Sequence, residues 1–426
     1  MIHGKEYLKR TIDSQIVEAL EVFGGVCIEG PKWCGKTWAA LNAAKSVFYV
    51  GDPAGNFQNR RLAEIDPTIA LAGEKPHLVD EWQEVPSLWD AVRFDVDQTQ
   101  GKGSYLLSGS SVPVQRGVMH TGTGRIGVIR MHPMSLAESG DSSGQVSLAG
   151  LFEDNLKAQQ TGDVELSTLA HLIVRGGWPG NLRVSEAKSG VAPRAYIEQV
   201  AERDASRLDD KSRDPHKMMM LLRSLARNES TLASMATLRR DIREYDDDDI
   251  SDNTVVEYLT VLTRIFAIYE QPAFNPRMRS SVRVGKKPKR HLADPSLAAA
   301  ALRATPKRLM TDLETFGFLF EALCERDLNV YAQALGGSLY HYRDALNREI
   351  DAVVELPDGR WGAFEIKLGA NQIDDAASGL IALKRDMEGD PGAIPPSILV
   401  VICGMSSFAY TRPDGVMVVP ITALGA

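Results

Sequence analysis

Cysteine is scarce in this sequence, and it contains neither a long hydrophobic run nor an excess of positive charge. The four cysteines among 426 residues are widely spaced and form no CxxC pair, which excludes a disulfide framework and a zinc site of paired cysteines. Apolar runs fall short of the roughly 18 residues of a membrane span, and the first residues lack the apolar core of a signal peptide. We therefore expect a cytoplasmic protein with no membrane partner.

The charge balance is acidic, with 48 Lys and Arg against 56 Asp and Glu and a formal net charge of −8. Such a chain has no global attraction for nucleic acid, so any contact with DNA or RNA has to come from a local basic patch. The composition, 44% hydrophobic and 24% charged, is that of a globular protein. The length suggests roughly two to four domains.

A glycine-rich stretch at residues 30–37 follows the pattern G-x-x-x-x-G-K-T of a phosphate-binding loop. It lies between the apolar run 26–28 and a segment that predicts a helix, which is the strand–loop–helix context that the motif requires. Backbone N–H groups at the helix start point toward bound phosphate. Lys36 is expected to reach the β- and γ-phosphates of ATP, and the Thr37 hydroxyl to bind Mg²⁺. The predicted phosphate-binding residues are Gly30, Pro31, Lys32, Trp33, Cys34, Gly35, Lys36 and Thr37.

A second strand pattern, residues 77–79, ends in two carboxylates, Asp80 and Glu81. Asp80 is expected to bind Mg²⁺ through water, and Glu81 to polarise the water that attacks the γ-phosphate. Both roles require a carboxylate at the carboxyl end of a parallel strand, where the phosphates lie.

Two later strands offer further contacts to phosphate. Residues 104–107 predict a buried strand, after which Ser108 or Ser110 contacts the γ-phosphate or the attacking water, unless the segment is a plain turn. Residues 124–131 predict another strand with Arg125 and Arg130. Each arginine is either a surface charge or a phosphate contact in its own or a neighbouring subunit, which leaves a homo-oligomer open.

The phosphate loop and the stretches 79–83, 107–110, 124–125 and 133–138 resemble a prokaryotic family of AAA-type ATPases. Residues 176–179 and 196–204 are similar to the same family, so the resemblance covers nearly the whole chain. It implies ATP and Mg²⁺ as ligands and an α/β fold with the parallel sheet of a P-loop NTPase. It also implies a C-terminal region similar to restriction endonucleases, with an undefined biological role.

We expect four parts in chain order. Residues 1–145 form the AAA-type ATPase core, which ends at the Gly- and Ser-rich stretch 140–150. Residues 146–215 form a helical lid or bridge. Residues 216–305 predict two short helices, an acidic turn at 246–249, a longer helix and a β-ribbon, which is the order of a winged helix. Residues 306–426 form an α/β domain like that of restriction nucleases.

The winged-helix-like part is ambiguous as a nucleic-acid contact. Its longer helix, from Ser251, carries no Arg or Lys before Arg264, whereas a helix that reads DNA normally offers several donors. Either the wing contacts nucleic acid, or the domain packs on other protein. The basic residues of the expected wing are Arg277, Arg279, Arg283, Lys286, Lys287, Lys289 and Arg290.

The C-terminal part contains a second candidate site. Asp351 lies on a predicted strand, and the returning strand places Glu365 and Lys367 on one face. This arrangement resembles the D-(x)n-E-x-K core of restriction-type nucleases, although E-x-K is also a common alternation on solvated strands. The resemblance implies that Asp351, Glu365 and Glu321 bind a divalent metal and that Lys367 orients or deprotonates water.

Three functions fit these patterns. The first is an ATPase whose nucleotide state controls a nuclease-like domain that acts on or binds nucleic acid through the basic wing and the C-terminal domain. The second is an ATP-dependent switch or scaffold whose C-terminal module is catalytically inactive. The third is a transcriptional regulator with ATP as effector, against which the acidic charge and the donor-poor helix argue.

Overall fold

The computed structural model of the protein describes residues 7–112, 118–208, 211–243, 251–344 and 346–426. The chain forms two compact units. The first comprises Met1–Pro133, Glu202–Arg213 and Leu259–Ala267. The second comprises Met134–Ala201, Asp214–Tyr258 and Ile268–Ala426. No helix of the described residues is long and apolar enough to cross a membrane.

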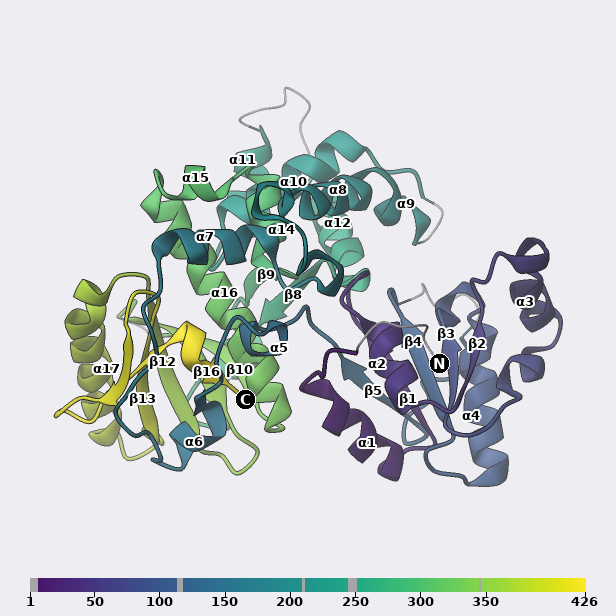
Figure 1. The fold of residues 1–426 in the computed structure, drawn as a ribbon, viewed down its shortest axis with the longest axis horizontal. Helices are drawn as coiled ribbons and strands as arrows, with labels where there is room; N and C mark the ends of the chain where they lie inside the picture. Colours follow the sequence, from purple (N-terminus) through teal and green to yellow (C-terminus); the bar gives the residue numbers. More distant parts are fainter. Residues whose placement is uncertain (1–6, 113–117, 209–210, 244–250, 345) are drawn as a thin grey trace. The chain divides into compact units, whose positions relative to one another are not determined.

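The first unit is built on a parallel sheet of five strands in the order β2-β3-β4-β1-β5 (Figure 1). Strand β1 is buried along its whole length between β4 and β5, as expected of a central strand covered on both faces. On one face Trp82, Val92 and Leu107 share a core with Cys27 of β1. The strands are β1 (Gly25–Glu29), β2 (Ser46–Tyr49), β3 (His77–Asp80), β4 (Tyr105–Gly109) and β5 (Ile126–Arg130). The helices are α1 (Ile12–Val22), α2 (Lys36–Ala43), α3 (Ala54–Ile65), α4 (Ser87–Thr99) and α9 (Ala205–Arg207).

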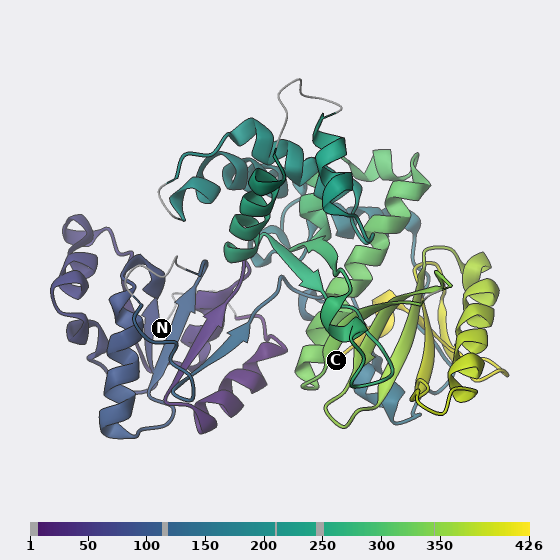
Figure 2. The same cartoon turned by 180° about the vertical axis from the view of Figure 1, so that it is seen from behind.

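The second unit contains a mixed sheet of seven strands in the order β10-β11-β12-β13-β15-β14-β7. Neighbours β12, β13 and β15 are parallel, and the other pairs are antiparallel. Helix α17 covers the sheet at β12 and β13 (Figures 1 and 2), where its Leu380 shares a core with Val353, Ala363 and Val401. The strands are β7 (Gln159–Gln160), β10 (Ser338–Arg343), β11 (Glu349–Glu355), β12 (Trp361–Lys367), β13 (Ile398–Cys403), β14 (Phe408–Thr411) and β15 (Met417–Pro420), with α16 (Leu313–Ala334) and α17 (Ile373–Glu388) as the long helices.

The rest of the second unit is mostly helical. Helices α10, α11 and α12 precede the antiparallel pair of β8 and β9, which is the element order predicted for residues 216–305, and a winged-helix fold stays a prediction. Only the first part of α12, up to Tyr258, belongs to this unit. The predicted acidic turn at 246–249 lies outside the described residues. The helices are α5 (Leu136–Ser139), α6 (Leu148–Phe152), α7 (Leu166–Arg175), α8 (Val191–Gln199), α10 (Pro215–Arg227), α11 (Met235–Arg243), α12 (Asp252–Arg264), α13 (Val282–Gly285), α14 (Pro295–Ala301) and α15 (Pro306–Leu309). The remaining strands are β8 (Ile268–Gln271), β9 (Lys289–Leu292) and the parallel pair β6 (Val146–Ser147) and β16 (Leu424–Gly425).

A buried cluster of ion pairs connects α16 to the N-terminus of α14. Arg326 of α16 lies 2.9 Å from Asp294, which caps α14, and 2.6 Å from its neighbour Asp327. The backbone N–H of Leu136 donates to Asp327 at 3.0 Å, and that of Gly177 donates to Asp294 at 3.0 Å. Buried charges are tolerated when they are paired and hydrogen-bonded, so this cluster fixes two loops against α16.

Candidate functional site

Two positions of the phosphate loop have a backbone conformation or surroundings that only glycine fits. It connects β1 to α2, and Gly35 has a φ of 106°, in the left-handed region that favours glycine. A Cβ atom on Gly30 would lie 2.2 Å from the carbonyl oxygen of Met131, so a larger residue does not fit there. The curled loop leads into the first turn of α2, whose N–H groups lack partners within the helix and are suited to phosphate.

Lys36 is buried, and its ammonium donates to the carbonyl oxygen of Pro31, in the same loop, at 2.8 Å. The ammonium therefore already faces the loop that is expected to surround phosphate. Among the other loop residues, Lys32 pairs with Asp204 at 2.7 Å, Trp33 is exposed and Cys34 is buried.

The start of α2 meets the end of β3. The Thr37 hydroxyl donates to the Asp80 carboxylate at 2.9 Å, and the Ser108 hydroxyl donates to the same carboxylate oxygen at 2.5 Å. Burial raises the pKa of Asp80, and the hydrogen bonds from Ser108 and Thr37 oppose the rise. A hydroxyl and a carboxylate are oxygen donors of the kind that Mg²⁺ prefers, so Thr37 and Asp80 fit this ion.

Glu81 takes a left-handed backbone conformation, with a φ of 58°. A residue other than glycine in this region is strained, and such strain is often found at functional sites. Its carboxylate accepts hydrogen bonds from the Gln83 side-chain amide and, at 3.2 Å, from the Ser110 hydroxyl. The backbone N–H of Glu81 donates to Ser108 at 3.3 Å, so both candidate serines contact the Asp80–Glu81 pair.

Two residues of this region, Gln83 and Glu29, were not predicted as site residues from the sequence. Gln83 follows Glu81 by two positions, and that short spacing was the available signal. Glu29, just before the loop, is buried, and burial raises the pKa of its carboxyl while the Arg130 guanidinium at 3.7 Å opposes the rise. No sequence pattern distinguished Glu29 from an ordinary strand end.

The phosphate contact predicted for Arg125 within its own subunit is wrong. Arg125 precedes β5, where its carbonyl accepts from the N–H of Gly25 at the start of β1, and its side chain pairs with Asp97 at 2.7 Å. Because the phosphate loop follows the other end of the parallel strand β1, Arg125 lies at the opposite edge of the sheet. Arg130 is at the loop's edge, where its guanidinium lies over the ring of Phe266.

In the second unit, β11 and β12 bring the predicted nuclease-like residues together. The Lys367 ammonium lies 3.0 Å from an oxygen of Asp351 and 2.6 Å from an oxygen of Glu365. The N–H of Ile366 donates to Asp351 at 2.7 Å. Burial, followed by the Asp351 charge, raises the pKa of Glu365 to about 7. Burial alone would lower the pKa of Lys367, but the two carboxylates outweigh it and the pKa is raised.

The predicted third carboxylate, Glu321, contacts a different cation. Lys289 is 5% exposed, and its ammonium lies 2.9 Å from Glu321 and 3.3 Å from Glu325. It also donates to the carbonyl oxygen of Asp351 at 3.2 Å. The described residues contain no group of three or more His, Cys, Asp or Glu that could hold a metal ion, so Glu321, Asp351 and Glu365 do not form the predicted three-carboxylate site. Lysine ammonium groups lie between the carboxylates instead.

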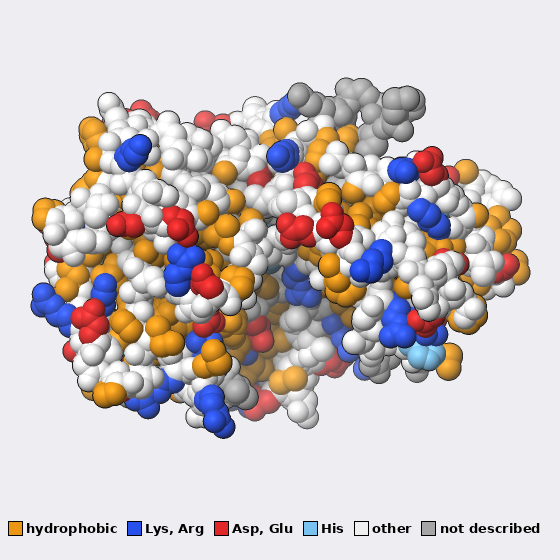
Figure 3. Space-filling view, turned by 90° about the horizontal axis from the view of Figure 1, so that it is seen from below, with side chains coloured by type: hydrophobic (Ala, Val, Ile, Leu, Met, Phe, Trp, Pro, Cys, Tyr) orange, Lys and Arg blue, Asp and Glu red, His pale blue; other side chains and the backbone are white. Residues whose placement is uncertain are grey.

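The burial of Lys289 also corrects the prediction made for this residue of the basic wing. Lys289 was predicted at a phosphate-binding surface but is buried. Arg283 is paired with Glu355 at 2.8 Å, Arg277 with Asp390 at 2.6 Å and Arg290 with Glu270 at 3.3 Å. On the face drawn in Figure 3, basic and acidic side chains are likewise interspersed. Four of the seven wing cations are therefore paired with carboxylates, and a contact of the wing with nucleic acid stays a prediction.

Comparisons with known proteins identify the first unit. Residues 23–140 match the family model described as "AAA domain". With the loop geometry above, the chain contains an AAA-type P-loop ATPase domain. Residues 166–308 and 316–424 match two domains of unknown function, DUF8612 and DUF4143, so the nuclease-like character of the C-terminal part stays a prediction.

Two mycobacterial proteins are similar over most of their length. They are the uncharacterized protein Rv2008c of Mycobacterium tuberculosis and the uncharacterized protein Mb2031c of Mycobacterium bovis. Each is 24% identical over 363 residues, which cover 84% of this chain and 74% of the relative. The Walker-type ATPase PABY2304 of Pyrococcus abyssi aligns with a TM-score of 0.44 and 13% identity, over 70% of this chain and 96% of that chain.

Proposed function

We propose that the protein binds ATP and hydrolyses it in a reaction that depends on Mg²⁺. The observation that carries the proposal is the contact between Thr37 and Asp80. A hydroxyl from the phosphate-loop helix lies 2.9 Å from a carboxylate at the end of β3, and these two groups hold Mg²⁺ in P-loop ATPases.

Each residue of the site has its own role in the binding and hydrolysis of ATP. Lys36 exchanges its bond to the Pro31 carbonyl for the β- and γ-phosphates, and the N–H groups at the start of α2 bind the same phosphates. Thr37 and Asp80 would hold Mg²⁺. The bound ion would neutralise negative charge on the phosphates. Glu81 polarises the attacking water, while Gln83 and Ser110 both donate to its other carboxylate oxygen, Oε2. Ser108 keeps Asp80 in place.

The direct test is release of inorganic phosphate from ATP by the purified full chain, with Mg²⁺ and with EDTA. We expect turnover with Mg²⁺ that EDTA abolishes. Phosphate release that is equal in both conditions would contradict the proposal.

A second proposal concerns the Asp351, Glu365 and Lys367 site, as a centre for metal-dependent cleavage of nucleic acid under control of the nucleotide state. Its support is the convergence of two carboxylates on one ammonium, within 3.0 Å and 2.6 Å. The alternative is a switch or scaffold with an inactive C-terminal module. The buried pairing of Lys289 with Glu321 favours this alternative, because it removes one expected ligand.

Cleavage assays separate the two. Duplex DNA, single-stranded DNA and RNA are each incubated with the full chain and Mg²⁺ or Mn²⁺, with and without ATP. Products that disappear in Lys367→Ala but persist in the exposed-lysine control Lys307→Ala would support the nuclease. Products that remain in Lys367→Ala, or no cleavage under any condition, would support the inactive module.

A further inference from the structure

A lysine ammonium lies among oxygens of the predicted metal site in the second unit. Lys289 of β9 comes from the region 166–308, whereas the oxygens around its ammonium come from the region 316–424. Glu321 and Glu325 of α16 contribute carboxylate oxygens, and Asp351 of β11 contributes its backbone carbonyl oxygen. All four residues belong to the second unit. One matched region therefore supplies a cation to the other.

All three donors of this ammonium are used. A lysine ammonium has three N–H groups, and that of Lys289 has three oxygen acceptors, at 2.9 Å, 3.3 Å and 3.2 Å. Carboxylate and carbonyl oxygens are also the ligands that Mg²⁺, Mn²⁺ and Ca²⁺ prefer. The three oxygens therefore form a site for a cation, and the cation that occupies it is part of the chain.

The strand that carries Lys289 is held by a second buried residue. His291 follows two positions later, so both side chains lie on the same face of β9. Its Nδ1 atom lies 2.9 Å from a carboxylate oxygen of Glu229, and its Nε2 atom lies 2.7 Å from the side-chain oxygen of Gln271. Because these side chains are buried as well, a movement of β9 that withdraws Lys289 would also have to break the contacts of His291.

The acidic residues around the ammonium have further partners. The second carboxylate oxygen of Glu325 accepts a hydrogen bond from the Ser230 hydroxyl at 2.9 Å. The carboxylate of Asp351 accepts from the backbone N–H of Ile366 at 2.7 Å. A divalent ion binds oxygen at about 2.0–2.6 Å, so it would have to displace the ammonium and draw these groups closer together. With Lys289 in place, the residues do not fit a divalent metal at this position.

We propose that Lys289 takes the place of a divalent cation between α16 and β11, and that a metal binds to Glu321 there only when the ammonium is removed. The proposal rests on neither proposed function, because it needs no turnover of ATP and no cleavage of nucleic acid. It excludes metal binding through Glu321 and leaves Asp351, Glu365 and Lys367 to the cleavage assays.

The experiment counts the Mn²⁺ ions bound per full chain by electron paramagnetic resonance, without nucleotide. Lys289→Ala removes the ammonium and leaves space between the oxygens. We expect this variant to bind one additional Mn²⁺ ion relative to the wild type, and the double variant Lys289→Ala, Glu321→Gln to lose it. The control Lys286→Ala removes an exposed lysine of the same segment and should match the wild type. In the wild-type background, Glu321→Gln should leave the number of bound ions unchanged.

Four results would overturn the proposal: no additional ion in folded Lys289→Ala, an additional ion that persists in the double variant, an additional ion in Lys286→Ala, or fewer ions in Glu321→Gln than in the wild type. Circular dichroism establishes whether Lys289→Ala is folded. If it is not, the comparison of Glu321→Gln with the wild type still decides, because a metal that already uses this carboxylate would be lost. Any Mn²⁺ at Thr37 and Asp80 contributes equally to every variant, so the result is independent of the proposed ATPase.

Discussion

Thr37 and Asp80, 43 positions apart in the chain, are joined by a hydrogen bond of 2.9 Å. Thr37 is in the first turn of the helix after the phosphate loop, and Asp80 is the last residue of strand β3. Strand β4 lies between β3 and the loop strand β1 in the sheet, so the contact reaches across a neighbouring strand. It brings together at one edge of the sheet the two groups that the proposed ATPase needs for Mg²⁺.

Removal of the Lys36 ammonium should weaken ATP binding. We expect Lys36→Ala to lose roughly 100-fold in affinity, or about 3 kcal/mol, because hydrogen bonds to charged phosphate are among the strong ones. Calorimetry with a non-hydrolysable ATP analogue measures the loss. Lys45→Ala, an exposed lysine paired with Glu74 at 3.4 Å, is the control and should bind normally. Equal affinity in the two variants would exclude Lys36 from the site.

Lys289 should be essential for the stability of the second unit. Lys289→Ala leaves Glu321 and Glu325 buried without their cation, and broken buried pairs typically destabilise by about 3–5 kcal/mol. Urea unfolding followed by circular dichroism would detect this change. Lys286→Ala alters an exposed residue of the same segment, and its effect should stay within about 0.5 kcal/mol. A Lys289→Ala protein as stable as Lys286→Ala would show that the buried pairing is wrong.

The free energy of unfolding should fall in mild acid because of the lowered pKa of His341. Burial, and next the charge of Lys289, lowers the pKa of His341 to about 4, below its ordinary value of about 6.5. The folded protein therefore keeps this ring neutral where the unfolded chain binds a proton. The stability contribution is present above pH about 6.5 and is lost as the pH falls toward about 4, by about 3 kcal/mol.

The test compares urea unfolding of the wild type and His341→Gln across that range. A glutamine amide can still donate to the carbonyl oxygen of Lys287, as Nε2 of His341 does at 3.1 Å, but it does not titrate. The stability difference between the two proteins should shrink or reverse as the pH falls. Substitution of the exposed His216 by Gln serves as the control, and parallel pH profiles for wild type and His341→Gln would refute the assignment.

The phosphate loop could be predicted from the sequence because its signal is local. The glycines, Lys36 and Thr37 are consecutive, and the apolar strand before them fixes their direction. Asp80 was found in the same way, from its place at a strand end. Lys289 could not be placed, because the carboxylates that bury it come from α16, 32 and 36 positions further along the chain. Alternation along a short strand does not show which face a distant helix will cover.

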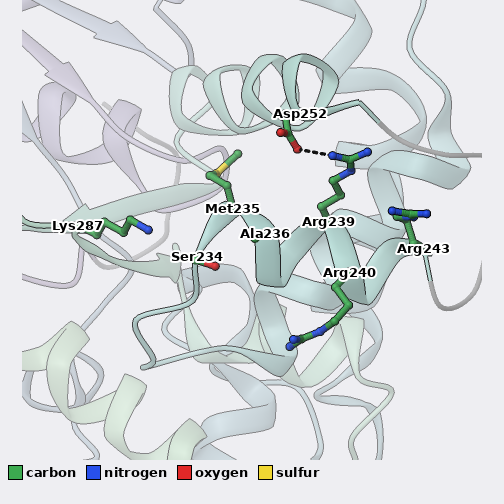
Figure 4. Close-up of a pocket in the computed structure, with 8 residues that line it drawn as sticks. All are labelled: Ser234, Met235, Ala236, Arg239, Arg240, Arg243, Asp252 and Lys287. Carbon is green, nitrogen blue, oxygen red and sulfur yellow. Dashed lines mark hydrogen bonds and ion pairs between the residues drawn. The ribbon is translucent and has the colours of Figure 1, made fainter. Parts of the chain in front are cut away.

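Arg125 illustrates an error of direction. It was chosen for its charge near a predicted strand, although the start of a parallel strand lies at the edge of the sheet away from the loop. The three arginines of α11 were overlooked because helical spacing alone does not distinguish a cavity lining from a solvated face. Arg239, Arg240 and Arg243 line one cavity together with Lys287, which comes from a separate loop (Figure 4).

The central claim, hydrolysis of ATP with Glu81 acting on the attacking water, is tested most directly by Glu81→Gln. Binding of MgATP by calorimetry and release of phosphate are measured on the same preparation. We predict an unchanged affinity and a turnover reduced by roughly 100-fold or more, because an amide cannot accept the proton that general-base catalysis removes. A Glu81→Gln protein that hydrolyses ATP at the wild-type rate would contradict the account.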